Sequence, residues 1–192
     1  MKEEVENKKN VVHSNFWSNF FRSPAEKTDL ENSLQSLPIF KSLSKKDIGL
    51  LMRISHNRNY IPGEYIFYQG DPGIGLYIIR EGKVIIERKT ENEDTILLAS
   101  FAKGDFFGEL ALVDGEKRSA SAIAQTDARL TVIFKPDLDE FIERYPKKGI
   151  KILNGISGII ALRLRKLNED FFHLYHQQLI RTEEVQHGTE NK

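Results

Sequence analysis

The order of hydrophobic and polar positions divides the chain into a central β-like region flanked by helical patterns. Residues 58–134 alternate short apolar runs with glycine-centred turns, as in YIFYQGDPG and GLYIIREGKVIIERK. Runs rich in branched and aromatic residues, bounded by Gly, Pro and Asp, are typical of strands joined by tight turns. We predict about eight short antiparallel strands that form a β-roll or jelly-roll barrel.

Helical patterns lie on both sides of this region. Ser44 precedes KKDIGLLMRI and has Asp47 three residues later, which predicts an N-cap and a helix start. A shorter helix is expected over residues 29–35. After Pro136 the sequence LDEFIERY predicts one helix, and residues from about 148 to 180 predict a much longer one. The expected fold class is α+β, mainly β.

The chain length of 192 residues suits one domain with extensions. We expect a partly helical N-terminal extension over residues 1–36, the β-roll over 37–145, the long helix over 146–180 and a polar tail over 181–192. The extension holds an aromatic cluster: Phe16, Trp17, Phe20 and Phe21. This cluster could pack on its own domain, which we favour, or dock onto a partner; membrane contact is not expected, because few basic residues flank it.

Composition removes several classes of protein. The 28 basic and 28 acidic residues cancel, so binding of nucleic acid through bulk charge is not expected. The absence of cysteine excludes disulfides, thiolate metal sites and cysteine nucleophiles. No secretory signal or membrane span is recognisable, so we expect a soluble, cytoplasmic protein.

One segment interrupts the rhythm of the strands. Residues 106–113 contain Gly108 and Glu109, which predict a tight turn that enters a single helical turn, whose free amides can receive an anion. Nine residues after Glu109, Arg118 adds a fixed positive fork of donors, and Ser119 adds a hydroxyl, a combination that suits a phosphodiester. The Glu109 carboxylate suits a sugar hydroxyl. The alternative is a surface ion pair between Arg118 and Glu109.

Two motifs resemble the cyclic nucleotide-binding domain family, which includes bacterial catabolite activators and regulatory subunits of cAMP-dependent protein kinase. FGELAL at 107–112 followed by RSA at 118–120 is similar to the phosphate-binding cassette of the family. QGDPGIGLYIIREG at 69–82 is similar to its second signature. The resemblance spans about residues 37–180.

The resemblance assigns ligand roles to individual residues. It implies that Glu109 binds the ribose 2′-hydroxyl and that Arg118 binds a cyclic-phosphate oxygen. The remaining contacts implied for the ligand come from Gly108, Leu110, Ala111, Ser119 and Ala120. The implied ligand is a cyclic nucleotide, with cAMP favoured over cGMP because serine rather than threonine follows the arginine.

The long helix carries an apolar seam at steps of three and four: Leu153, Ile156, Ile160, Leu164, Leu167, Phe171 and Leu174. The resemblance implies that residues 156–170 form a homodimer contact in which one subunit's helix caps the other subunit's site, with Leu167 and Asn168 at the nucleobase. A helix folded back onto its own roll is the alternative. The residues after Ile180 are too few for a winged helix-turn-helix, so a DNA-binding role is not expected.

We therefore predict a regulatory sensor that passes ligand occupancy through its C-terminal helix to an unidentified protein partner. The alternative is a ligand-free dimeric scaffold of the same fold. No catalytic residue, catalytic cofactor or metal site is predicted, because the cassette has no metal-ligand cluster and no placed base for hydrolysis. His173, His176 and His187 have no cluster of further metal-ligating residues near them in the sequence, so we do not expect them to bind a metal ion.

Overall fold

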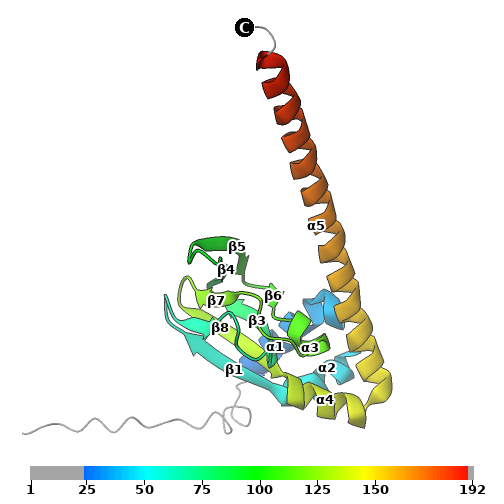
Figure 1. The fold of residues 1–192 in the computed structure, drawn as a ribbon. Helices are drawn as coiled ribbons and strands as arrows, with labels where there is room; N and C mark the ends of the chain where they lie inside the picture. The colour runs from blue at the N-terminus through cyan, green and yellow to red at the C-terminus, as the bar shows by residue number, and fades with distance from the viewer. Residues whose placement is uncertain (1–23, 190–192) are drawn as a thin grey trace, which may run out of the picture.

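The computed structural model describes residues 24–189 (Figure 1). The aromatic cluster from Phe16 to Phe21 lies outside the described residues. The helical elements are α1 (Pro24–Ser36), η1 (Pro38–Phe40), α2 (Lys45–Leu51), η2 (Met52–Ile54), α3 (Leu110–Val113), α4 (Lys135–Arg144) and α5 (Pro146–Thr189). The strands are β1 (Ser55–Tyr60), β2 (Tyr65–Phe67), β3 (Gly75–Glu81), β4 (Lys83–Lys89), β5 (Thr95–Ala102), β6 (Phe106–Phe107), β7 (Ser121–Ala124) and β8 (Ala128–Phe134).

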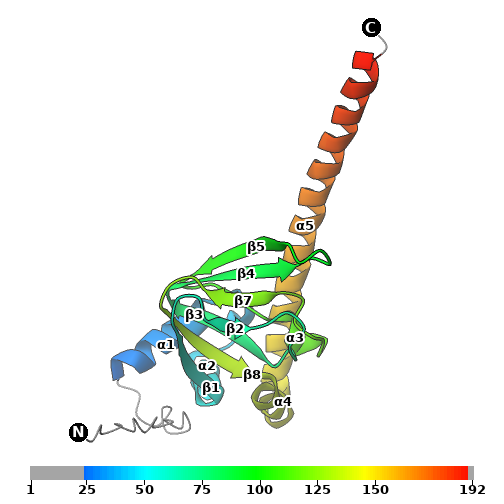
Figure 2. The same cartoon turned by 60° about the vertical axis from the view of Figure 1, so that its left-hand side comes forward.

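The eight strands form two antiparallel sheets. Their orders are β1-β8-β3-β6 and β2-β7-β4-β5. This arrangement confirms the predicted β-roll of about eight strands with flanking helices. Within the described chain the two sheets do not close into a barrel, because each keeps two edge strands. Figure 2 shows α5 passing along one side of the roll and continuing beyond it.

Strand β3 is buried on both faces and separates two hydrophobic cores. Leu76 and Ile78 belong to a core shared with α1, η1, α2 and α5, where Ile152 and Ile156 are fully buried. Tyr77 and Ile79 face the other way, into the core between the sheets. This division follows from the two-residue period of a strand, which sends successive side chains to opposite faces. The helices therefore pack against one face of β3, an inner strand of its sheet.

Helix α1 begins at Pro24, five residues before the predicted start at residue 29, because proline is tolerated in the first turn of a helix. The start of α2 agrees with its sequence signal. Ser44 caps α2 as predicted: its hydroxyl accepts the Asp47 N–H, and the Asp47 carboxylate accepts the Ser44 N–H. Lys148 Nζ lies 2.7 Å from Asp47 Oδ1. The Lys148 contact, followed by the Ser44 contact, lowers the pKa of Asp47 to about 2. One carboxylate thus joins the first turn of α2 to the first turn of α5.

Helix α5 is longer than predicted. It ends at Thr189 rather than near Ile180, so the first nine residues of the expected polar tail are helical. These residues contain no proline, and most are tolerated in a helix. Although α5 has the length of a membrane span, neither it nor any other helix within residues 24–189 carries a sufficiently apolar stretch.

Candidate functional site

The turn between β6 and α3 forms one side of the candidate site. Strand β6 pairs with β3 through Tyr77 and Phe107, and the chain then turns at Gly108, whose φ is 82°. A Cβ atom at Gly108 would lie 2.8 Å from Arg118 Nη1 and 2.9 Å from the Gly75 carbonyl oxygen. Only glycine fits this backbone without strain or collision. The predicted tight turn into a single helical turn is therefore confirmed.

This turn opens onto a cavity of about 320 Å³. The volume lies at the lower end of the range for small-molecule pockets, roughly 300–1,000 Å³. Seven of the predicted ligand residues line it: Gly108, Glu109, Leu110, Ala111, Arg118, Ser119 and Ala120. The opposite wall is apolar and comes from Ile86 of β4 and from Ala99 and Phe101 of β5. The cavity therefore has a polar end and an apolar end.

Arg118 is buried at the polar end, with only 6% of its surface exposed. Its Nη2 donates to the Gly75 carbonyl at 2.8 Å, and its Nη1 donates to the Gly108 carbonyl at 3.2 Å. The guanidinium also lies 4.1 Å above the centre of the Phe67 ring. Burial lowers the pKa of Arg118, whereas nearby Tyr77 and Glu109 raise it. Its buried Nε has no hydrogen-bond partner within the described chain, so the side chain retains a donor.

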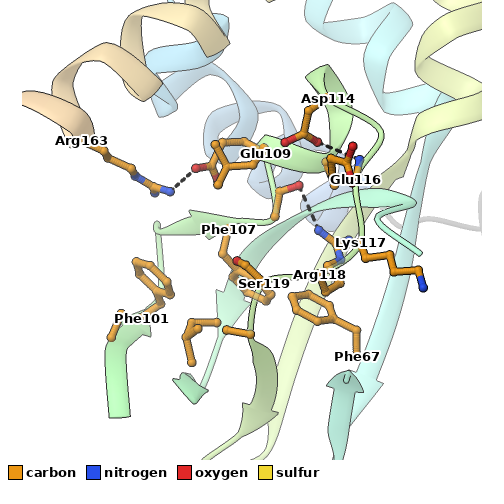
Figure 3. A pocket seen from close by; sticks show the side chains of 16 residues that line it. Phe67, Phe101, Phe107, Glu109, Asp114, Glu116, Lys117, Arg118, Ser119 and Arg163 are labelled. Atoms are coloured by element: carbon orange, nitrogen blue, oxygen red, sulfur yellow. Dashed lines mark hydrogen bonds and ion pairs between the residues drawn. The ribbon is translucent and has the colours of Figure 1, made fainter. Parts of the chain in front are cut away.

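Glu109 is the second buried charge of the cavity, and its partner is Arg163 rather than Arg118. Arg163 Nη1 donates to Glu109 Oε1 (Figure 3). Arg163 Nη2 donates to the Phe106 carbonyl at 3.2 Å. The expected alternative, a surface pair between Glu109 and Arg118, is absent from the ion pairs of the described residues, and both side chains are buried. Arg118 and Glu109 therefore line the same cavity without forming an ion pair with each other.

Arg163 was not among the predicted site residues. It lies on α5, 54 residues from Glu109, and its Cζ is 5.3 Å from the centre of the Phe106 ring. The helical pattern of residues 156–170 contained a usable signal, because Arg163 lies one turn before Leu167 on the same helix. The sequence alone does not show which residues of α5 lie where the helix crosses the roll.

Leu167 and Asn168 do not line the cavity of the single chain. From Leu162 to Gln178 every residue of α5 is exposed, and the exposed fraction of Leu167 is 64%. Helix α5 leaves the roll toward its C-terminal end, as Figure 1 shows, and neither residue is among those that line the cavity. Within one chain, Ile86, Ala99 and Phe101 of β4 and β5 supply apolar lining instead, and Arg163 Cζ lies 5.9 Å from the centre of the Phe101 ring.

No metal centre accompanies the cavity. Residues 24–189 contain no cluster of three or more His, Asp or Glu side chains, among those described, that could hold a metal ion. His173 and His176 lie beside the Phe172 ring, each with ring centres 6.3 Å apart. His187 belongs to the part of α5 whose side chains are not described.

Comparisons with known proteins agree with this geometry. Residues 57–145 match the sequence profile described as "Cyclic nucleotide-binding domain". The cyclic AMP receptor protein of Thermus thermophilus is 34% identical over 133 residues, which cover 69% of this chain and 60% of that protein. A regulatory subunit of cAMP-dependent protein kinase from Hypocrea atroviridis is 34% identical over 105 residues, covering 55% of this chain and 22% of that protein.

A solved structure extends the similarity to three dimensions. The crystal structure of the Thermus thermophilus catabolite activator protein matches with a TM-score of 0.64 and 34% identity. The match covers 71% of this chain and 62% of that one. The chain therefore spans less than two thirds of the length of each of these relatives.

The close approach at Gly108 can be tested against a second glycine of similar φ. Gly104 has a φ of 93°, but a Cβ atom there would meet nothing within 4 Å. We expect Gly104→Ala to cost about 1 kcal/mol of unfolding free energy from backbone strain alone. Gly108→Ala should cost about 2–3 kcal/mol, because the new methyl group also displaces Arg118. Urea unfolding measures both variants, and equal losses would contradict the proposed collision.

Proposed function

This chain belongs to the cyclic nucleotide-binding domain family, and we propose that it is a cAMP sensor that passes ligand occupancy to a partner through α5. Domains of this family bind regulatory ligands and are not themselves enzymes. The observation that carries the proposal is the convergence of two buried, oppositely charged side chains, Arg118 and Glu109, on one cavity. A buried charge is costly unless it has a partner, so such a pair of sites suits a ligand with matching groups.

The proposed ligand contacts follow from the chemistry at each end of the cavity. A cyclic phosphate carries one negative charge and would accept from Arg118, the Ser119 hydroxyl and the amides of residues 108–111. Arg163 occupies Oε1 of Glu109, which leaves Oε2 to accept the ribose 2′-hydroxyl. The purine would lie against Ile86, Ala99 and Phe101, which offer an apolar surface for its ring.

The preference for adenine rests on Ser119, the residue after Arg118, and on the resemblance stated above. The ligand-free scaffold is the second candidate. It accounts for the exposed apolar residues of α5 but gives no role to the buried Nε of Arg118, which has no hydrogen-bond partner within the described chain. Its proposed docking segment, the aromatic cluster from Phe16 to Phe21, lies outside the described residues. A cytoplasmic location stays a prediction.

Calorimetry with cAMP and cGMP tests the binding proposal. We expect the chain to bind cAMP more tightly than cGMP. Arg118→Ala should weaken cAMP binding about 100-fold or more, because it removes charge-assisted hydrogen bonds to the phosphate, and Glu109→Gln should weaken it about 10-fold. Arg88→Ala removes an exposed arginine of β4 outside the cavity and should leave affinity unchanged. A wild-type chain that binds no cyclic nucleotide would overturn the proposal.

Transmission through α5 is proposed from the Arg163–Glu109 pair. One carboxylate would serve both the ribose and the helix, so ligand binding would change the contact that holds α5 to the roll. A ligand shifts a conformational equilibrium only through contacts that differ between the two states. Arg163 provides such a contact, because it joins α5 to both Glu109 and the Phe106 carbonyl.

Spin-label distances can test this coupling, because the chain has no cysteine that would compete for the label. Labels at Glu91→Cys in the β4–β5 turn and Glu169→Cys in α5 report the position of the helix relative to the roll. We expect cAMP to change this distance in the wild-type background and in Arg165→Ala, a matched arginine two residues further along α5. Arg163→Ala should abolish the change; a response that persists would refute the role of Arg163.

A homodimer through α5 is proposed from its exposed apolar side chains. Leu164, Leu167, Phe171 and Leu174 are 55%, 64%, 67% and 66% exposed and follow one another at steps of three or four. A continuous apolar stripe of this kind on a protein surface marks an interaction site. A second copy of α5 has the same stripe and would cover it in the manner of a coiled coil.

Sedimentation analysis tests the dimer. We expect the wild-type chain to sediment as a dimer, and a Leu167→Lys, Leu174→Lys double variant to sediment as a monomer, because two charges would be buried in the seam. Glu169→Lys adds positive charge to the same helix outside the seam and should remain dimeric. A wild-type chain that stays monomeric at about 100 μM contradicts the proposal, because a dimer with a Kd below that concentration would be evident.

A further inference from the structure

The loop between β2 and β3, residues 68–74, carries the second glycine-centred motif and lies against the segment that holds Arg118. The Gly70 N–H donates to the Arg118 carbonyl at 2.8 Å, and the Arg118 N–H donates to the Asp71 carbonyl at 2.8 Å. Pro72 and Lys117 form an isolated antiparallel bridge next to these bonds. The loop and the Arg118 segment thus form a short ladder. The position of the loop is tied to the polar end of the cavity.

Gln69 extends from this loop to the β4–β5 hairpin. Its Oε1 accepts the Lys89 N–H at 2.9 Å, and its Nε2 lies 3.5 Å from the Lys89 carbonyl oxygen. Its main-chain N–H donates to Ser121 Oγ at 2.9 Å. One residue therefore contacts the end of β4, the start of β7 and, through Gly70, the Arg118 segment.

Gln69 contacts Lys89 in the part of β4 that no longer pairs with β7. Pairing between β4 and β7 ends at Glu87 and Ser121, whereas β4 continues to Lys89 paired with β5 alone. The Gln69 side-chain amide contacts the backbone N–H and carbonyl of Lys89, two residues past the last β4–β7 pair. It therefore replaces the backbone partner that a neighbouring strand would provide at this position. Side-chain amides can replace backbone partners in this way because they carry one acceptor and a donor group.

The same hairpin supplies the apolar wall of the cavity. Ile86 and Ala99 face each other across β4 and β5, next to an irregularity in the pairing between Ile86 and Glu87. An irregular rung is a point at which the hairpin can change its twist. Beyond this point the hairpin is held to the rest of the roll by the Glu87–Ser121 pair with β7 and by the contacts of Gln69 with Lys89.

We propose that Gln69 is a positioning residue that holds the apolar wall of the cavity at the correct distance from the phosphate end, and so contributes to recognition of the nucleobase. This inference rests on the proposed function. Gln69 itself does not line the cavity. Its effect should therefore depend on whether the ligand has a base.

Binding of two probes to the full chain separates this role from a general effect on folding. One probe is cAMP, and the other is a base-free ribose 3′,5′-cyclic phosphate, measured by competition. Gln69→Ala should weaken cAMP binding about fivefold, equivalent to the loss of roughly one hydrogen bond, and change binding of the base-free probe less than about twofold. Amide exchange at Lys89, measured by NMR, should become faster, because its N–H loses its acceptor.

Two further variants serve as controls. Gln69→Glu keeps an oxygen that can accept the Lys89 N–H and should retain more cAMP affinity than Gln69→Ala. Gln125→Ala removes another exposed glutamine, in the turn between β7 and β8, and should change neither probe. Equal weakening of both probes by Gln69→Ala, or no weakening of either, overturns the positioning role while the proposed function stands. A wild-type chain that binds neither probe overturns both.

Discussion

The buried guanidinium of Arg118 is the contact on which the rest of the site depends. Its two terminal nitrogens bind the carbonyls of Gly75, where β3 begins, and Gly108, where the chain turns into α3. Its backbone pairs with the loop after β2. A charge placed in a protein interior is costly unless hydrogen bonds replace its water, and here two carbonyls do so. The same contacts that hold three segments together thus create the positive end of the cavity.

Strand β3 connects this site to the helices. Its alternate residues enter two different cores, so the helical layer and the cavity share one support. Arg80, also on β3, is 4% exposed and pairs with Asp29 of α1, a contact that lowers the pKa of Asp29. Arg163 makes a comparable tie from α5 to Glu109. Helices from both ends of the described chain are therefore fastened to the roll by charged contacts.

The phosphate end and the apolar wall of the cavity are held in place by different contacts. The turn that holds Gly108 and Arg118 is fixed by hydrogen bonds and by the lack of space for any side chain at Gly108. The wall made by β4 and β5 is an edge of its sheet, where β5 has a partner on one side only. Beyond Glu87 strand β4 also lacks its β7 partner, and Gln69 contacts β4 there. This difference explains why the proposed role of Gln69 concerns the wall and not the phosphate end.

Local sequence determined the features that depend on neighbouring residues. The seven cassette residues that line the cavity were assigned as a set by the family resemblance. The local features are the Ser44–Asp47 cap, the alternation of strands and turns and the glycine turn before Glu109. Each depends on backbone preference or on residues close in the chain, so its signal is present in the sequence. Only the tertiary structure decided that Arg163 pairs with Glu109 across 54 residues and that Leu167 and Asn168 do not line the cavity of their own chain. Both outcomes depend on where α5 leaves the roll, and periodicity defines the faces of a helix but not the point at which packing ends.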